Sequence, residues 1–195
     1  NEYKIPKDKF ILGGLSNGGM ISLTYTELSA KDSTKTIVKP AAVFAVDPPI
    51  DDAHFYKYCE REILRNYSEA GKNEAIWIKN IFDTEYGGSP DSIPEVYIKR
   101  SIYSYGAKNG GNAEYLIDTP LRLYTDLDLE YLLKEKHRDL YDWNGTDIIA
   151  MTNELKNLGH EDIEVILSTE KGLQSNGTRK PHSWAILDSN SLIPW

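Results

Sequence analysis

The pentapeptide Gly-Leu-Ser-Asn-Gly at residues 14–18 is the feature that most restricts the fold of this chain. It follows a short apolar run at 9–13 and precedes a segment, 17–30, whose apolar residues are spaced as on a helix. A serine between two glycines at a strand-to-helix junction is typical of a turn that lifts the hydroxyl above the sheet. The motif therefore predicts a strand, a sharp turn at Ser16 and a helix, with no room for a side chain at either flanking glycine.

Three further apolar runs, at 41–46, 121–125 and 162–169, predict buried strands. Helical patterns lie at 146–158 and 183–193. Strands that alternate with helices are typical of an α/β fold, in which a mostly parallel sheet is flanked by helices. We therefore predict this fold class.

Residues 51–118 interrupt the alternation of strands and helices. They are charged and rich in tyrosine, with helical patterns at 53–66 and 74–82 and loop-forming residues after them. We expect a largely helical insertion that caps the carboxyl ends of the strands. The predicted organisation is a first core segment at 1–50, the cap insertion, and a second core segment at 119–195 that carries the acid and histidine loops.

The composition excludes several classes of function. The chain has 22 Lys and Arg against 30 Asp and Glu, a net charge of −8, which disfavours binding to nucleic acids and anionic membranes. The single cysteine, Cys59, cannot form an internal disulfide or a multi-cysteine metal centre. No apolar run approaches the roughly 18 residues of a membrane-spanning helix. We expect no cofactor, and the compartment, cytoplasmic or exported, is left open.

A serine nucleophile needs a histidine base and a carboxylate to orient that base. His182 lies in a loop after the last predicted strand, at the sheet edge that would present Ser16. Asp126 and Asp128 follow the third strand at the same edge, and residue chemistry alone does not decide between them. The other aspartate is expected to cap a helix. The chain order Ser, Asp, His is that of α/β-hydrolases.

The remaining histidines are weaker candidates for a base. His160 follows a glycine at the end of a predicted helix and is expected to be solvated, and His137 lies in a charged run typical of an exposed face. His54 follows two aspartates that are better interpreted as helix caps than as metal ligands.

These segments resemble the C-terminal part of the α/β-hydrolase fold and, more narrowly, bacterial hydrolases of the esterase type. The similar segments are FILGGLSNGG (10–19), AAVFAVDPPID (41–51), LYTDLD (123–128), ILST (166–169) and KGLQSNGTRKPHSWAILD (171–188). The resemblance covers nearly the whole chain, although the cap insertion contributes little to it. It implies a serine hydrolase with Ser16 as nucleophile and His182 as base, and it favours Asp128 over Asp126 as the acid.

The resemblance also implies a substrate and a mechanism. A small carboxylic ester or related acyl compound would be cleaved through an acyl-enzyme intermediate, with the Asn17 backbone N–H donating to the oxyanion. We expect Leu15, Phe55 and Tyr56 to contact the substrate, although aromatic residues of a cap can also form its core. A peptidase or acyltransferase on the same triad, or a non-catalytic module that binds a ligand through its cap, are the alternatives.

In the α/β-hydrolase fold about half of the sheet precedes the nucleophile strand. Here only residues 1–8 precede that strand. We therefore expect the N-terminal half of the fold to be missing from this chain or supplied by another chain. The strand before Ser16 would then have an open edge, and a second oxyanion donor would be lacking. The alternative is a rearranged minimal hydrolase that closes its own sheet.

Overall fold

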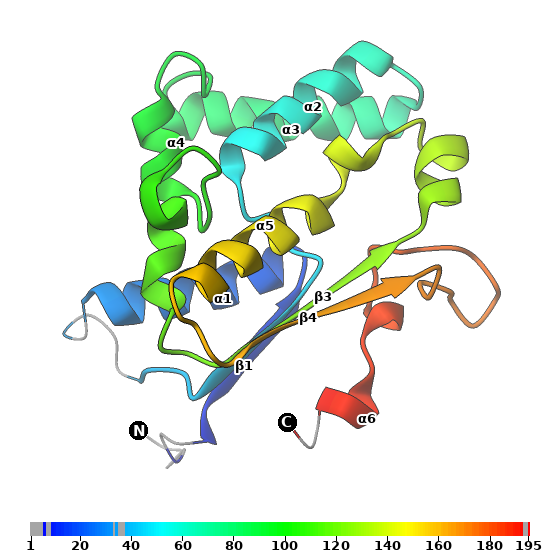
Figure 1. The fold of residues 1–195 in the computed structure, drawn as a ribbon. Coiled ribbons are helices and arrows are strands. Elements are labelled where there is room, and N and C mark those ends of the chain that lie inside the picture. The colour runs from blue at the N-terminus through cyan, green and yellow to red at the C-terminus, as the bar shows by residue number, and fades with distance from the viewer. Residues whose placement is uncertain (1–5, 7–8, 33, 35–37, 193–194) are drawn as a thin grey trace.

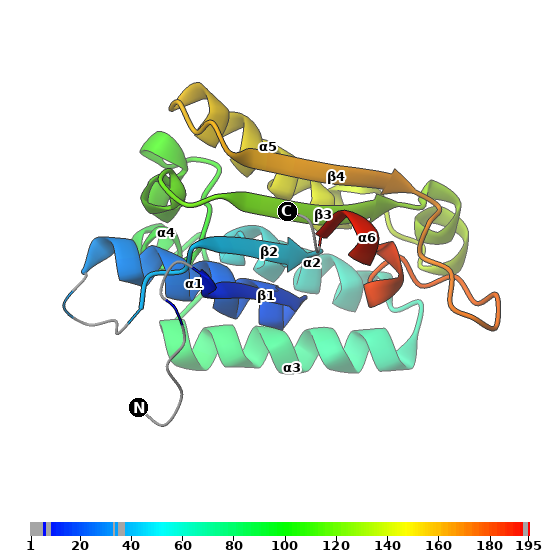
Figure 2. The same ribbon diagram turned by 90° about the horizontal axis from the view of Figure 1, so that it is seen from below.

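The computed structural model describes residues 6, 9–32, 34, 38–192 and 195. They form an α/β fold around one four-stranded sheet in which all strands are parallel (Figures 1 and 2). The strands lie side by side in chain order: β1 (Ile11–Leu15), β2 (Ala42–Val46), β3 (Leu121–Leu127) and β4 (Ile163–Thr169). The α/β class is thereby confirmed, and each strand lies within two residues of its predicted bounds.

Helical segments cover both faces of this sheet, as Figure 2 shows. One face carries α1 (Asn17–Lys31), α5 (Asn144–Asn157) and the 3-10 segment η2 (Lys108–Leu116). The other face carries two short pieces, η5 (Trp184–Ile186) and α6 (Ser189–Leu192). The predicted single helix at 183–193 is therefore divided, and its predicted end at Ile193 lies outside the described residues.

The alternation of side chains along each strand creates one core on each face of the sheet. Val43 and Ala45 of β2 are fully buried in the larger core, which also contains α1, α5 and η2. Val46, on the opposite face, packs with Tyr124 and Ile186 in the smaller core. The two inner strands, β2 and β3, are buried along most of their length, and strands buried on both faces have nearly continuous apolar sequences.

A separate helical layer lies at the top of Figure 1. It consists of α2 (Asp52–Arg65), α3 (Glu69–Tyr86) and α4 (Pro94–Arg100). This layer has its own aromatic core, formed by the buried rings of Tyr56, Phe82 and Tyr97. We call these three helices the cap.

The predicted cap insertion extends to residue 118, whereas the last helix of the observed cap ends at Arg100. Ile102, Tyr103, Ala113 and Leu116 are buried in the larger core of the sheet, not in the aromatic core of the cap. Residues 102–116 therefore pack as part of the main core. Two short turns complete the fold, a π-helical one, η3 (Tyr131–Glu135), and a 3-10 one, η4 (Leu140–Asp142).

The strand before Ser16 lies at an edge of the sheet. Within the described residues β1 pairs only with β2, as expected of a strand with an open edge. A search of the same residues for a helix long and apolar enough to cross a bilayer finds none.

One buried polar contact joins the cap to the core. His54 Nδ1, on α2, lies 2.7 and 2.8 Å from the two carboxylate oxygens of Asp147 on α5. Burial by itself lowers the pKa of His54, but the hydrogen bond and charge of Asp147, with the charge of Asp51, outweigh it. The pKa of His54 therefore lies above its usual value, and the protonated ring binds the core more tightly than the neutral ring does.

We expect the contact between His54 and Asp147 to stabilise the fold most below about pH 6.5, the usual pKa of histidine. Its contribution, about 1 to 3 kcal/mol, should disappear as the pH rises through the raised pKa of folded His54. Urea unfolding of the wild type and of His54→Gln across this pH range measures the difference.

His160→Gln is the control for this experiment. Burial lowers the pKa of His160, so its contribution should fall as the pH drops below about 6.5, the opposite trend. If the difference between wild type and His54→Gln grows with pH, the assignment of a protonated His54 is wrong.

Candidate functional site

Ser16 occupies the turn between β1 and α1 in a backbone conformation that is rare for residues with side chains. Its φ is 54° and its ψ is −121°. Such a conformation costs about 1–3 kcal/mol and persists only where the surroundings hold it. Here the Ser16 N–H donates to the Val46 carbonyl at 2.8 Å, and the Ser16 carbonyl accepts the Met20 N–H at 3.0 Å. The predicted strand, turn and helix are present, with the serine in a strained turn.

The glycines around this turn do not all serve the purpose predicted for them. A Cβ on Gly14 would lie 2.3 Å from the backbone carbonyl carbon of Gly18, so the turn closes only with glycine at position 14. A Cβ on Gly18 would meet nothing within 4 Å, so the prediction that both flanking glycines are required is wrong for Gly18. Gly19 is also crowded, since its Cβ would lie 3.0 Å from the Gly14 carbonyl oxygen and 3.1 Å from the Ala45 Cβ.

We expect Gly14→Ala to destabilise the protein by about 3 kcal/mol, since the methyl group would displace the backbone of the turn. Gly18→Ala is the matched control and should change stability by less than about 1 kcal/mol, because alanine favours the helix that starts there. Thermal unfolding followed by circular dichroism compares the two variants. Equal losses of stability would mean that the turn is not as tight as described.

His182 is oriented by a buried aspartate at the end of β2. Its Nδ1 lies 2.7 Å from Asp47 Oδ2, and the Asp47 residue is 6% exposed. Thr125 Oγ1 donates to Asp47 Oδ1 at 2.8 Å, and Asn144 Nδ2 donates to the Asp47 carbonyl at 3.0 Å. These bonds fix the carboxylate, place the proton of the neutral imidazole on Nδ1, and leave Nε2 as its basic nitrogen.

The predicted contact between Asp128 and His182 is wrong. Asp128 instead accepts the N–H of Tyr131 at 2.9 Å and pairs with Arg179 at 2.8 Å. Asp126 does not contact His182 either, because its carboxylate accepts hydrogen bonds from β4 and from the loop that follows β4. The carboxylate in contact with the histidine is Asp47.

The register of the sheet explains why Asp47 takes this place. Val46, the residue before Asp47, pairs with Leu15, the residue before Ser16. On its other side Val46 pairs with Tyr124, so the two predicted aspartates lie two and four residues beyond this level. Asp47 comes directly after it, on the strand next to Ser16.

Ser16, Asp47 and His182 line one cavity of about 780 Å³ between the carboxyl ends of the strands and the cap. Its wall is mixed. The aromatic side chains in it are Phe55, Tyr58, Tyr67, Trp77, Tyr131 and Trp143, and the charged residues include Glu62, Glu74, Lys136 and Arg138. A nucleophile and its base are expected within hydrogen-bond reach, but no hydrogen bond joins Ser16 Oγ to His182 in the described structure. The two side chains nevertheless share the cavity at the sheet edge where they were predicted.

The other predicted site residues divide between wall and core. Phe55 lines the cavity, and its contact with a substrate stays a prediction. Tyr56 does not, because its ring is buried in the cap core and its hydroxyl donates to Asp83 at 2.9 Å. Leu15 packs against the smaller core of the sheet and lines a separate hollow on the other side of His182. Asn17 is the exposed first residue of α1.

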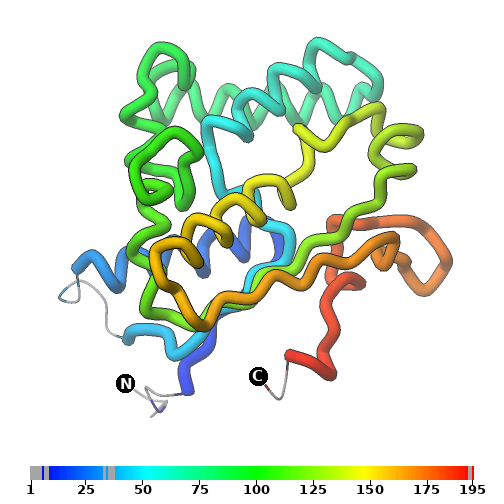
Figure 3. The backbone as a smooth tube through the Cα atoms, viewed as in Figure 1, coloured from blue at the N-terminus to red at the C-terminus, as the bar shows by residue number. Residues whose placement is uncertain are grey.

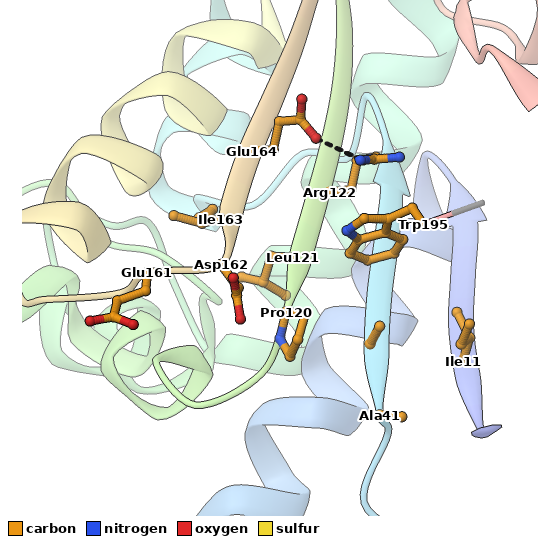
Figure 4. Close-up of a pocket in the computed structure, with 11 residues that line it drawn as sticks. Ile11, Ala41, Pro120, Leu121, Arg122, Glu161, Asp162, Ile163, Glu164 and Trp195 are labelled. Atoms are coloured by element: carbon orange, nitrogen blue, oxygen red, sulfur yellow. Dashed lines mark hydrogen bonds and ion pairs between the residues drawn. The ribbon is translucent and has the colours of Figure 1, made fainter. Parts of the chain in front are cut away.

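Another hollow, of about 590 Å³, lies at the opposite, amino ends of the strands (Figure 4). Arg122 pairs there with Glu164 at 2.9 Å and stacks on the Trp195 ring at 4.8 Å, so its charge is already neutralised. Among the residues that the structure describes, no serine, cysteine or histidine lines this hollow. Ligands of open parallel sheets bind at the carboxyl ends of the strands, which favours the cavity of Ser16.

Other candidate nucleophiles and bases are buried or occupied. Burial raises the pKa of the Cys59 thiol to about 12, so this cysteine is not a thiolate at neutral pH. His160 is buried and its Nε2 lies 3.0 Å from the Thr119 carbonyl, so the prediction of a solvated histidine is wrong. His137 is exposed, as predicted, and stacks on Tyr67. The described residues contain no cluster of His, Cys, Asp and Glu that could hold a metal ion.

Comparisons with known proteins find no matching family model and no matching curated protein. Among solved structures, the chain is similar to the crystal structure of VinJ, with 12% sequence identity and a TM-score of 0.39. The similar region covers 90% of this chain and 61% of the VinJ chain. A likeness this distant says nothing about activity or ligand.

Proposed function

We propose that this protein is a serine hydrolase of the α/β-hydrolase type that cleaves a carboxylic ester or related acyl compound. Ser16 would be the nucleophile, His182 the base and Asp47 the residue that orients the base. The observation that carries this proposal is the strained serine at the β1–α1 turn, which shares one cavity with a histidine bonded to a buried carboxylate. Strain of this kind gathers at functional sites.

The proposed chemistry is that of a serine, histidine and aspartate acting together. His182 Nε2 takes the Ser16 proton as Oγ attacks the acyl carbon, while Asp47 stabilises the imidazolium through Nδ1. The Asn17 N–H, at the start of the 15-residue helix α1, donates to the oxyanion. His182 then protonates the leaving group, which departs. Water attacks the acyl-enzyme with His182 again as base, and the acid product and free Ser16 are released.

The wall of the cavity supports an apolar or aromatic acyl group as substrate. Its aromatic side chains come from both the cap, as with Phe55 and Trp77, and the core, as with Trp143. Such surfaces bind apolar groups by removing them from water. A volume of about 780 Å³ suits a small molecule.

Two alternatives use the same site. A non-catalytic module could bind a ligand in the cavity, but it would gain nothing from a strained serine that shares the cavity with an oriented histidine. A peptidase or acyltransferase would use the same three residues and differ in leaving group or acyl acceptor. Turnover of a panel of acyl esters of increasing chain length and of aminoacyl amides, with and without added alcohols, separates these activities.

We expect a fluorophosphonate probe to label the wild type and not Ser16→Ala, because only an activated serine reacts with it. Ser68→Ala is the matched control, since Ser68 lines the same cavity with an ordinary backbone φ of −127°. This variant should keep its labelling. A wild type that stays unlabelled and turns over no member of the panel would leave the binding module as the better account.

Asp47→Asn should lower kcat by about four orders of magnitude, because the amide no longer selects the tautomer with a free Nε2. Asp128→Asn removes a carboxylate of the same kind without touching His182 and should have a much smaller effect. Steady-state kinetics of the two variants on the best ester compares them. A larger loss for Asp128→Asn would show that Asp47 is not the orienting acid.

A further inference from the structure

We propose that Asp126 is a positioning residue for His182, and that it acts by holding the loop that carries the histidine. This inference rests on the proposed hydrolase function. The loop, residues 170–183, leaves the end of β4, turns back and passes to the underside of the sheet (orange to red in Figure 3). His182 lies near its end, so the path of the loop decides where the imidazole meets Asp47.

The carboxylate of Asp126 binds the first part of this loop. Its Oδ1 accepts the Lys171 N–H at 3.0 Å, and its Oδ2 accepts the Gly172 N–H at 3.0 Å. Ser168 Oγ, on β4, donates to Oδ1 at 2.5 Å. Asp126 is 2% exposed and has no ion-pair partner among the described residues. Burial of an unpaired carboxylate is costly, and here the hydrogen bonds from the loop N–H groups and from Ser168 offset that cost.

A short hairpin within the loop connects the segment that Asp126 binds to His182. We call residues 171–173 the outgoing strand of this hairpin and residues 179–181 its returning strand. The Lys180 N–H donates to the Gly172 carbonyl at 2.6 Å, which joins the outgoing strand to the residue two before His182. A Cβ on Gly172 would lie 2.5 Å from the Pro181 Cα, so the two strands touch at this level. Leu173 and Arg179 pair one step further along. Asp126 therefore binds the segment against which Lys180 and Pro181 rest.

A second carboxylate, directly after the end of β3, binds the returning strand. Asp128, 3% exposed at its side chain, pairs with Arg179 Nε at 2.8 Å. Arg179 also reaches Glu130 at 3.2 Å and Glu170 at 3.5 Å. Asp126, on β3, and Asp128, directly after β3, thus bind the outgoing and returning strands of the hairpin, while neither touches the histidine itself.

Asp126→Asn is the decisive variant, because one oxygen is replaced by an amide group that cannot accept a loop N–H. Misplacing a catalytic group by about 1 Å can cost about 100-fold in rate, so we expect Ser16 labelling and kcat to fall about 10- to 100-fold with KM little changed. The proton resonance of His182 Nδ1–H in its bond to Asp47 should broaden or disappear, and amide exchange over 171–183 should accelerate.

Ser168→Ala is the matched control. It removes a hydrogen bond to the same carboxylate but from the β4 side, and it leaves both loop N–H bonds in place. Labelling, kcat and the His182 resonance should stay close to those of the wild type. If Asp126→Asn does not fold, Arg179→Ala tests the returning strand by the same measurements, with Arg179→Lys expected to restore part of the rate.

The outcomes separate this inference from the proposed function. A folded Asp126→Asn protein that keeps the wild-type labelling rate and the His182 resonance would overturn the positioning role. If the wild type itself is not labelled at Ser16, the hydrolase proposal fails. In that case the resonance and the amide exchange of 171–183 still decide whether Asp126 holds the loop.

Discussion

The Asp47 carboxylate bonds at once to the imidazole of His182 and to the hydroxyl of Thr125, and the rest of the site depends on this junction. The Asp47 carboxylate lies between the end of β1, just before Ser16, and the loop that follows β4. Because the carboxylate is buried, each of its bonds is stronger than it would be in water and costly to leave unmade. The junction therefore fixes the loop of His182 to the end of the sheet.

Three aspartates with the same chemistry have different tasks at this edge of the sheet. Asp47 meets a ring nitrogen, Asp126 meets backbone N–H groups, and Asp128 meets a guanidinium. The position of each aspartate along or after β2 or β3 determines which groups surround it, and these groups determine what its carboxylate binds. The two carboxylates that do not touch the histidine still bear on its position, because both hold the hairpin before it.

The cap has a core of its own and yet contributes part of the wall of the cavity. Its aromatic core, with Tyr56, Phe82 and Tyr97, is separate from both cores of the sheet. The bond between His54 and Asp147 ties α2 to α5 beside the cavity wall. The shape of a cavity bounded by the cap depends on the orientation of the cap, and this contact helps to set that orientation.

The sequence by itself determined the α/β class, the four strands and the turn at Ser16, because buried strands and tight turns depend on residues that are close in the chain. It also placed His182 at the sheet edge of Ser16, although its role as a base is a proposal. Only the tertiary structure decided which aspartate meets His182. An aspartate follows both the second and the third strand, and the choice between them depends on strand register. The tertiary structure also decided that Tyr56 lies in the cap core while Phe55 lines the cavity. Adjacent residues of a helix point about 100° apart, and only packing shows which side is covered.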